Sequence, residues 1–210
     1  MSRNYALNTE LAKEAGVSNR IDATGKYIGK FTRAEAVHSK EQTEGVEFTF
    51  QSTDKRTADF LTCWTFNVEG KELYGLKMVN ALMTCMKVKE IKPQQGTVER
   101  YDGKVAQVEL FQDLMNKPIG VLLQKEEYQK NDGTIGTKFN IVGCFDAVTE
   151  MTAKEILERA IKAEQLGGMV ALLKDRPMSN KKTTTQNART ASNSGSGNHA
   201  FADFEDDIPF

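Results

Sequence analysis

The chain has 210 residues, of which 39% are hydrophobic and 27% are charged, as in a globular protein with one well-packed domain and extensions, or with two small domains. No apolar run approaches the roughly 18 residues of a membrane span, and the start lacks the apolar core of a signal peptide, so we expect a cytoplasmic protein. Three widely spaced cysteines and only two histidines argue against a disulfide framework and a zinc site. We expect buried free thiols and no metal or cofactor.

Charge is balanced along most of the chain. There are 28 basic and 29 acidic side chains, and residues 177–210 hold three of the bases and four of the acids. The rest of the chain is therefore neutral, and a site for a polyanion would have to come from local clustering of bases.

Residues 1–20 are predicted to be an N-terminal extension. A short helix is expected over residues 8–15, with Asn8 or Thr9 as its cap and Gly16 as its stop. This helix would pack on the main domain, which we place at residues 21–150.

Three strands are predicted next, over residues 26–37, 46–51 and 58–68. In the first, a period of two puts Lys26 and Lys30 on one face and Tyr27, Phe31 and Arg33 on the other. The second alternates cleanly and directs its aromatic residues toward a core. Three consecutive strands of this kind form a meander.

The third strand carries apolar residues on both faces, and two arrangements are compatible with it. If Leu61 and Cys63 point into the core, then Phe60, Trp64 and Phe66 are left toward solvent, as a stacking platform for bases requires. In the other arrangement these aromatic residues form the core face, where such side chains usually lie.

An amphipathic helix is predicted over residues 72–88, followed by two hairpins. The first has strands 97–101 and 104–111 around Asp102-Gly103, and the second has strands 119–129 and 137–147 around residues 131–133. Three strands, a helix and a closing strand pair are the order of a five-stranded OB barrel. The fold is therefore predicted to be mainly β with helices, with the 97–111 hairpin inserted in the barrel.

Residues 151–176 are predicted to be a helical extension. Thr152 and Glu155 form a capping-box pattern, which opens a helix to about Leu166. The Gly167-Gly168 pair would break it before an apolar turn at residues 169–173. Packing within the chain is the expected role of its apolar stripe, and pairing with a second subunit is the alternative.

Residues 177–200 are rich in polar and small residues and are predicted to be a disordered linker. Residues 201–210 then mix acids with apolar side chains. A terminal Phe210 after Pro209 presents a ring and a carboxylate, which suits an apolar pocket rimmed by Arg or Lys. A solvated chain end is the alternative. The partner-binding tip comprises Asp203, Phe204, Glu205, Asp206, Asp207, Ile208, Pro209 and Phe210.

This tip closely resembles the acidic C-terminal tip of bacterial and bacteriophage single-stranded DNA-binding proteins. More loosely, residues 33–36 and 60–65 resemble segments of the phage-encoded members. The resemblance implies a protein that protects single-stranded DNA without strong sequence preference in a bacterial cell, encoded by the host or by a phage. It also implies that the tip recruits replication, recombination or repair enzymes.

Nine residues are the candidates for the DNA contact. Bases would stack on Trp64 and on one or more of Phe60, Phe66 and Tyr27, and phosphates would bind Lys26, Lys30, Arg33, Lys55 and Arg56. Each of these lysines and arginines could equally be an ordinary charged residue of the surface. No catalytic motif occurs, so we do not expect an enzyme. A recombination mediator or annealing protein on the same fold is the alternative function, as is a decoy that occupies host enzymes through the tip.

Overall fold

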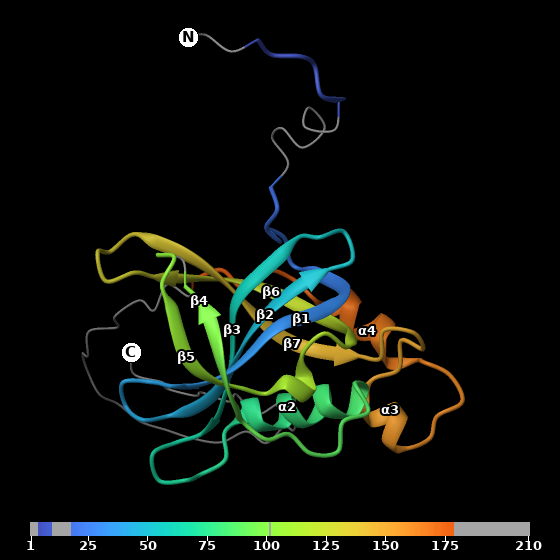
Figure 1. The fold of residues 1–210 in the computed structure, drawn as a ribbon. Coiled ribbons are helices and arrows are strands. Elements are labelled where there is room, and N and C mark those ends of the chain that lie inside the picture. Colours follow the sequence, from blue (N-terminus) through green and yellow to red (C-terminus); the bar gives the residue numbers. More distant parts are fainter. Residues whose placement is uncertain (1–3, 10–17, 101, 179–210) are drawn as a thin grey trace, which may run out of the picture. The chain divides into compact units, whose positions relative to one another are not determined.

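A computed structural model describes residues 4–9, 18–100 and 102–178 (Figure 1). The predicted helix at residues 8–15, most of the linker and the whole tip thus lie wholly or partly outside the described residues. The strands are β1 (Gly25–His38), β2 (Glu44–Ser52), β3 (Thr57–Phe66), β4 (Gln94–Glu99), β5 (Val105–Leu110), β6 (Pro118–Gln129) and β7 (Ile135–Phe145). The helices are α2 (Tyr74–Cys85), α3 (Ala153–Leu157) and α4 (Gln165–Leu172), with a 3₁₀ turn, η1 (Gln112–Leu114).

The long strand β1 organises one antiparallel sheet in the order β3-β2-β1-β5-β4. The first residues of β1, Gly25 to Lys30, also pair with β6, which pairs in turn with β7. Strands β3 and β7 lie beside each other, but no ladder joins them among the described residues, so the sheet is open. The predicted mainly β class with helices and an additional hairpin is confirmed, whereas closure into a barrel is not observed.

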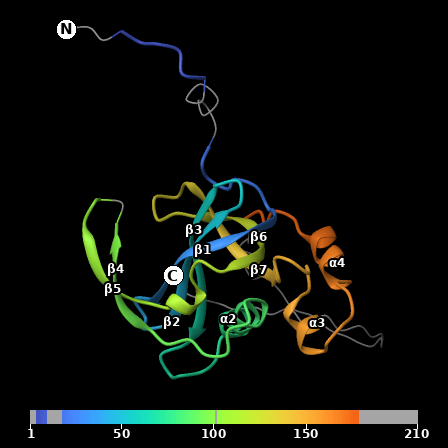
Figure 2. The same ribbon diagram turned by 45° about the vertical axis from the view of Figure 1, so that its right-hand side comes forward.

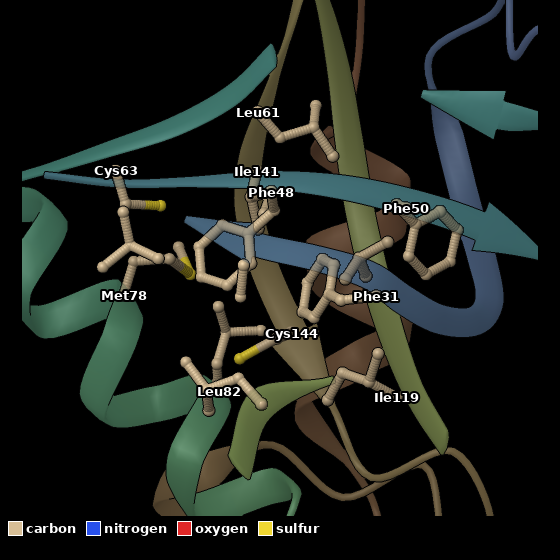
Figure 3. Packing of buried hydrophobic residues seen from close by; sticks show 14 of the residues in the cluster. Phe31, Phe48, Phe50, Leu61, Cys63, Met78, Leu82, Ile119, Ile141 and Cys144 are labelled. Carbon is tan, nitrogen blue, oxygen red and sulfur yellow. The ribbon is translucent and has the colours of Figure 1, made fainter. Parts of the chain in front are cut away.

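The core lies on the inner face of this sheet, against α2 (Figure 3). Alternation along β2 buries Phe48 and Phe50 completely, and Phe31 packs against both rings. The apolar stripe of α2 contributes Leu82. Each such side chain stabilises the fold by about 1.5–3 kcal/mol through burial. All three cysteines are buried and free, as predicted, and burial raises the pKa of the Cys63 thiol to about 12.

A β-bulge in β1 changes the face on which Arg33 lies. Phe31 pairs with Phe50 and Arg33 with Thr49, so β1 holds one extra residue, Thr32, between them. Because an inserted residue shifts the alternation by one position, Phe31 stays in the core while Arg33 moves to the outer face. The prediction that these two residues share a face was therefore wrong.

Helices α3 and α4 also differ from the prediction of one helix ending at Gly167-Gly168. The predicted capping box between Thr152 and Glu155 is present, but α3 ends at Leu157. Arg159 then adopts a left-handed φ of 56°, and the Ala160 N–H donates to the Glu155 carbonyl, as in a Schellman motif. This motif usually contains glycine, so its Arg concealed the end of the helix.

Helix α4 covers the outer face where β1, β6 and β7 meet. Leu166 at its start packs with Leu122 and Phe145 in a second apolar cluster, with Ile28 and Met169 against it. This cluster explains why both glycines, predicted to break a helix, are tolerated within α4: side-chain packing on the sheet stabilises the helix around them. In the described ranges, no helix has the length and apolar character needed to cross a membrane.

Candidate nucleic-acid interface

The outer face of β3 carries the aromatic residues whose direction was undecided. Leu61 and Cys63 are buried in the core, which turns Trp64 outward, where it is half-buried. Phe60 is 55% exposed. The arrangement with the aromatic residues outside the core is therefore the one adopted for Phe60 and Trp64.

Phe60 is held in an unusual backbone conformation. Its φ is 59°, a left-handed region that costs a bulky non-glycine residue about 1–3 kcal/mol. The cause is a bulge, because Phe48 pairs with Leu61 while Phe50 pairs with Ala58. This extra residue directs both Asp59 and Phe60 away from the core. Strain of this kind concentrates at functional sites.

Phe66 does not continue the platform. Gly45 pairs with Trp64, but Glu44 pairs with Phe66, so Thr65 is an extra residue in β3. Cross-strand partners point to the same face, and consecutive residues of β2 point to opposite faces. Phe66 is therefore turned away from the face that presents Trp64, in contrast to the simple alternation of the sequence.

A groove of about 400 Å³ lies beside Phe60, between the outer face of the sheet and the β4–β5 hairpin. Strands β1 to β3 supply one side of it, including Arg33, Thr49 and Phe60, and β4 supplies Val98 with the following Arg100. Figure 2 shows the β4–β5 hairpin as a bowed ribbon at the edge of the sheet. The groove thus combines an exposed ring and the apolar side chain of Val98 with two arginines and two acids, Asp59 and Glu99.

Glu35 bridges the two arginines, and Glu47 pairs with Arg33. Arg33 donates to Glu47 at 2.6 Å and lies 3.6 Å from Glu35. Arg100 binds Glu35 through both terminal nitrogens, at 3.1 and 2.6 Å. Burial raises the pKa of Glu47 despite the opposing effect of Arg33, while the hydrogen bonds to Glu35 raise the pKa of Arg100. These four charges cancel, and Asp59, which pairs with Arg20, and Glu99 add two acids to the lining. An anion would therefore have to approach the guanidinium of Arg100, the more exposed of the two arginines.

Three of the other predicted contacts, Lys26, Tyr27 and Arg56, lie away from the groove lining. Lys26 pairs with Glu150 and lies over the Phe145 ring. Tyr27 packs against the core and lies 5.5 Å from the Arg56 guanidinium. Arg56 pairs with Asp54 in the β2–β3 turn. The hydrogen bond from Arg56 and, to a smaller extent, the one from Ser52 lower the pKa of Asp54 to about 2.

Lys30 and Lys55 are exposed and also lie outside the groove lining. The predicted set is therefore dispersed: Phe60 and Arg33 line the groove, and Trp64 shares the outer face with them. The tip residues 203–210 lie outside the described residues.

Sequence reasoning missed two features of the outer surface. Arg100 was within a predicted hairpin strand, but its partner Glu35 is 65 positions away and no local pattern connects them. Tyr128, on the β6–β7 hairpin, is 38% exposed. It pairs with Gly136, above which its ring passes, and Lys138 lies 5.9 Å from the ring centre. An aromatic residue paired with glycine across two strands was the available signal.

The described residues contain no group of three or more side chains suited to hold a metal ion. Comparison with known proteins finds no matching family model and no matching curated protein.

Proposed function

We propose that the protein binds single-stranded DNA without strong sequence preference and recruits partner enzymes through its C-terminal tip. The observation that carries the first part is the outward direction of Phe60 and Trp64 from a strand whose Leu61 and Cys63 are buried in the core. An exposed ring costs hydrophobic stabilisation, and Phe60 adds backbone strain. Such a ring can stack on any base, because every base has a π face.

The order of the elements supports an OB arrangement for this role. Strands β1, β2 and β3, helix α2, and strands β6 and β7 follow the order of that fold, with β4–β5 as an insertion. OB folds are partly open barrels that bind single strands on one face and its loops. On this proposal, β3 and β7 are the strands between which the barrel remains open.

In this proposal, stacking supplies most of the affinity for single-stranded DNA, and phosphate contacts supply the remainder. Stacking in single-strand-binding OB folds contributes about 1–3 kcal/mol per base. Phe60 and Trp64 would receive bases beside the groove, and Tyr128 would extend the path along the β6–β7 hairpin. Lys138 lies close to Tyr128 and pairs with Glu126 at 3.4 Å, and a phosphate bound there would compete with Glu126 for it. Since the acids of the groove offset its two arginines, the affinity should decrease only moderately with salt.

The tip supports the second part of the proposal through its sequence. Four acids would steer it toward a basic partner, and Ile208 and Phe210 would enter an apolar pocket there. The linker of residues 177–200 would let the tip search the space around the DNA-bound domain. Single strands covered by the domain would thereby be marked for replication, recombination or repair enzymes.

Titration with poly-dT and with duplex DNA tests the first part. Trp64 is the only tryptophan, so stacking should quench the fluorescence of this one residue with poly-dT and much less with duplex. Phe60→Ala should weaken poly-dT binding about fivefold or more, whereas the control Tyr74→Ala should not, although Tyr74 is 63% exposed. If neither poly-dT nor duplex DNA changes the fluorescence of Trp64 or binds measurably, DNA binding is excluded and the decoy function remains.

A further inference from the structure

The β4–β5 hairpin bends over the outer face of the sheet, and one ion pair reveals this. At its base the hairpin joins β1 through the Glu35–Leu110 pair and through the bond from the Phe111 N–H to the Ala34 carbonyl. Arg100 lies at the far end of the hairpin, where its backbone N–H donates to the Lys104 carbonyl. A flat hairpin would carry it about 20 Å from Glu35, farther than the two side chains extend. Their contact therefore requires a curved hairpin.

The curvature brings one face of the hairpin over the groove. Val98 pairs with Ala106, and Gly96 pairs with Val108. Alternation places all four of these uncharged residues on the same face of the hairpin as Arg100. Val98 and Arg100 both line the groove opposite Phe60. A DNA strand whose base stacks on Phe60 would thus lie between this aromatic ring and the β4–β5 hairpin.

Arg100 is the more accessible of the two arginines in the groove. The Arg33 side chain is 14% exposed, and the Arg100 side chain is 38% exposed. The bidentate bond to Glu35 uses two of the five N–H donors of a guanidinium. The remaining donors of Arg100 can bind a phosphate while Glu35 fixes the plane of the group.

We propose that Arg100 is the phosphate contact of this groove, and that Glu35 is the positioning residue that holds it over the bound strand. The inference rests on the proposed function, since it names a ligand group for the same groove. The hairpin is then a wall that closes one side of the DNA path. The nucleic acid backbone would run along the hairpin, and its bases would face Phe60 and Trp64.

The salt dependence of poly-dT binding tests the role of Arg100. Loss of one phosphate contact should lower the slope of log K against log salt by about 0.7 for a single strand. Arg100→Gln should show this change and an affinity about tenfold lower at roughly 50 mM salt. Lys104→Gln, at the tip of the same hairpin, removes an equal charge and should keep the wild-type slope. A wild-type slope in Arg100→Gln would overturn the proposal.

Glu35→Gln separates positioning from simple charge. This change makes the groove more positive, so charge alone predicts tighter binding of DNA. Loss of positioning instead predicts binding about threefold to tenfold weaker. Glu109→Gln, an exposed acid of β5, is the matched control and should bind slightly tighter. Tighter binding by both variants would overturn the role of Glu35.

Arg100→Lys keeps the charge but loses the planar fork. It should retain the salt slope and lose affinity, and wild-type affinity would count against positioning. The outcome also separates the two proposals. If the wild-type protein does not bind poly-dT, the proposed function fails. If it binds poly-dT but Arg100→Gln leaves the slope of log K against log salt unchanged, only the assignment of Arg100 fails.

Discussion

The ring of Trp64 passes directly over Gly45, its partner on the neighbouring strand. A Cβ atom at position 45 would lie 2.8 Å from Cε3 of this ring, so no other residue fits without displacing it. The glycine thus allows the ring to lie against the outer face of the sheet. Tyr128 and Gly136 repeat the arrangement on the β6–β7 hairpin.

Gly45→Ala is predicted to displace Trp64. The added methyl group overlaps the ring, and overpacking of this kind costs about 1–3 kcal/mol. Denaturant unfolding should show that loss, and the emission maximum of Trp64 should shift to longer wavelength as the ring moves into water. Gly70→Ala is a control for a glycine with open space around it; it costs stability through its positive φ without shifting the emission.

Phe60→Asn is predicted to separate stability from binding. Asn tolerates the left-handed backbone, so the free energy of unfolding should rise by about 1 kcal/mol. Binding of poly-dT should weaken roughly 5- to 150-fold, as expected for the loss of a stack. Phe60→Leu keeps the strain but removes the ring, so it should lose binding without gaining stability. If Phe60→Asn binds like wild type, this residue is no stacking platform.

DNA binding is predicted to strengthen as the pH falls, through Glu47. Burial holds the pKa of Glu47 above its ordinary value, so its carboxyl takes up a proton before exposed glutamates do. Arg33 then keeps only the more distant Glu35 carboxylate as a neutralising partner, and the groove gains one positive charge. For a phosphate about 7 Å away this is worth roughly 0.6 kcal/mol, or about threefold in affinity.

The control for this effect is Glu47→Gln, which cannot titrate at that position. Poly-dT affinity measured from pH 7 down to pH 5 should rise less in the variant than in the wild type. Superimposable pH profiles would assign the pH dependence to other groups.

The stability of the α3–α4 connection is predicted to depend on ionised Glu155. Its carboxylate accepts the N–H groups of Glu164, Thr152 and Gln165, and these bonds lower its pKa to about 2. Since the folded pKa is below the unfolded value, the stabilisation is present above about pH 4.5 and is lost as the pH falls toward 2.

Glu155→Gln should therefore lower Tm at pH 7 by the few degrees expected for a lost helix cap. The Tm values of variant and wild type should converge as the pH approaches 2. The exposed Glu158, which pairs loosely with Lys154, offers a control: Glu158→Gln should change Tm little. A difference for Glu155→Gln that stays constant with pH would contradict this role of its charge.

Deletion of residues 201–210 is predicted to raise affinity for poly-dT at low salt, because four acids no longer compete with DNA for basic groups. It should also abolish capture of replication or repair enzymes. Phe210→Ala keeps all four acids, so it should lose the partner enzymes and retain wild-type DNA affinity. Unchanged or weaker DNA binding after the deletion would count against competition by the tip.

Local patterns in the sequence predicted most of the fold. The alternation of β2 identified its core face, Asp102-Gly103 marked the β4–β5 turn, and Thr152 with Glu155 marked the start of α3. These features depend on residues close together in the chain, so their physical causes are visible in a short segment. The stacking candidates Phe60 and Trp64 were also found this way.

The sequence by itself determined the strands, the hairpins, the amphipathic helix α2 and the acidic tip. Tertiary structure alone decided the directions of Arg33 and Phe66, because one extra residue in a strand reverses every later side chain and the register depends on the partner strand. It also decided the contact between Arg100 and Glu35. The curvature of a hairpin depends on packing against the rest of the sheet, and no short segment contains that information.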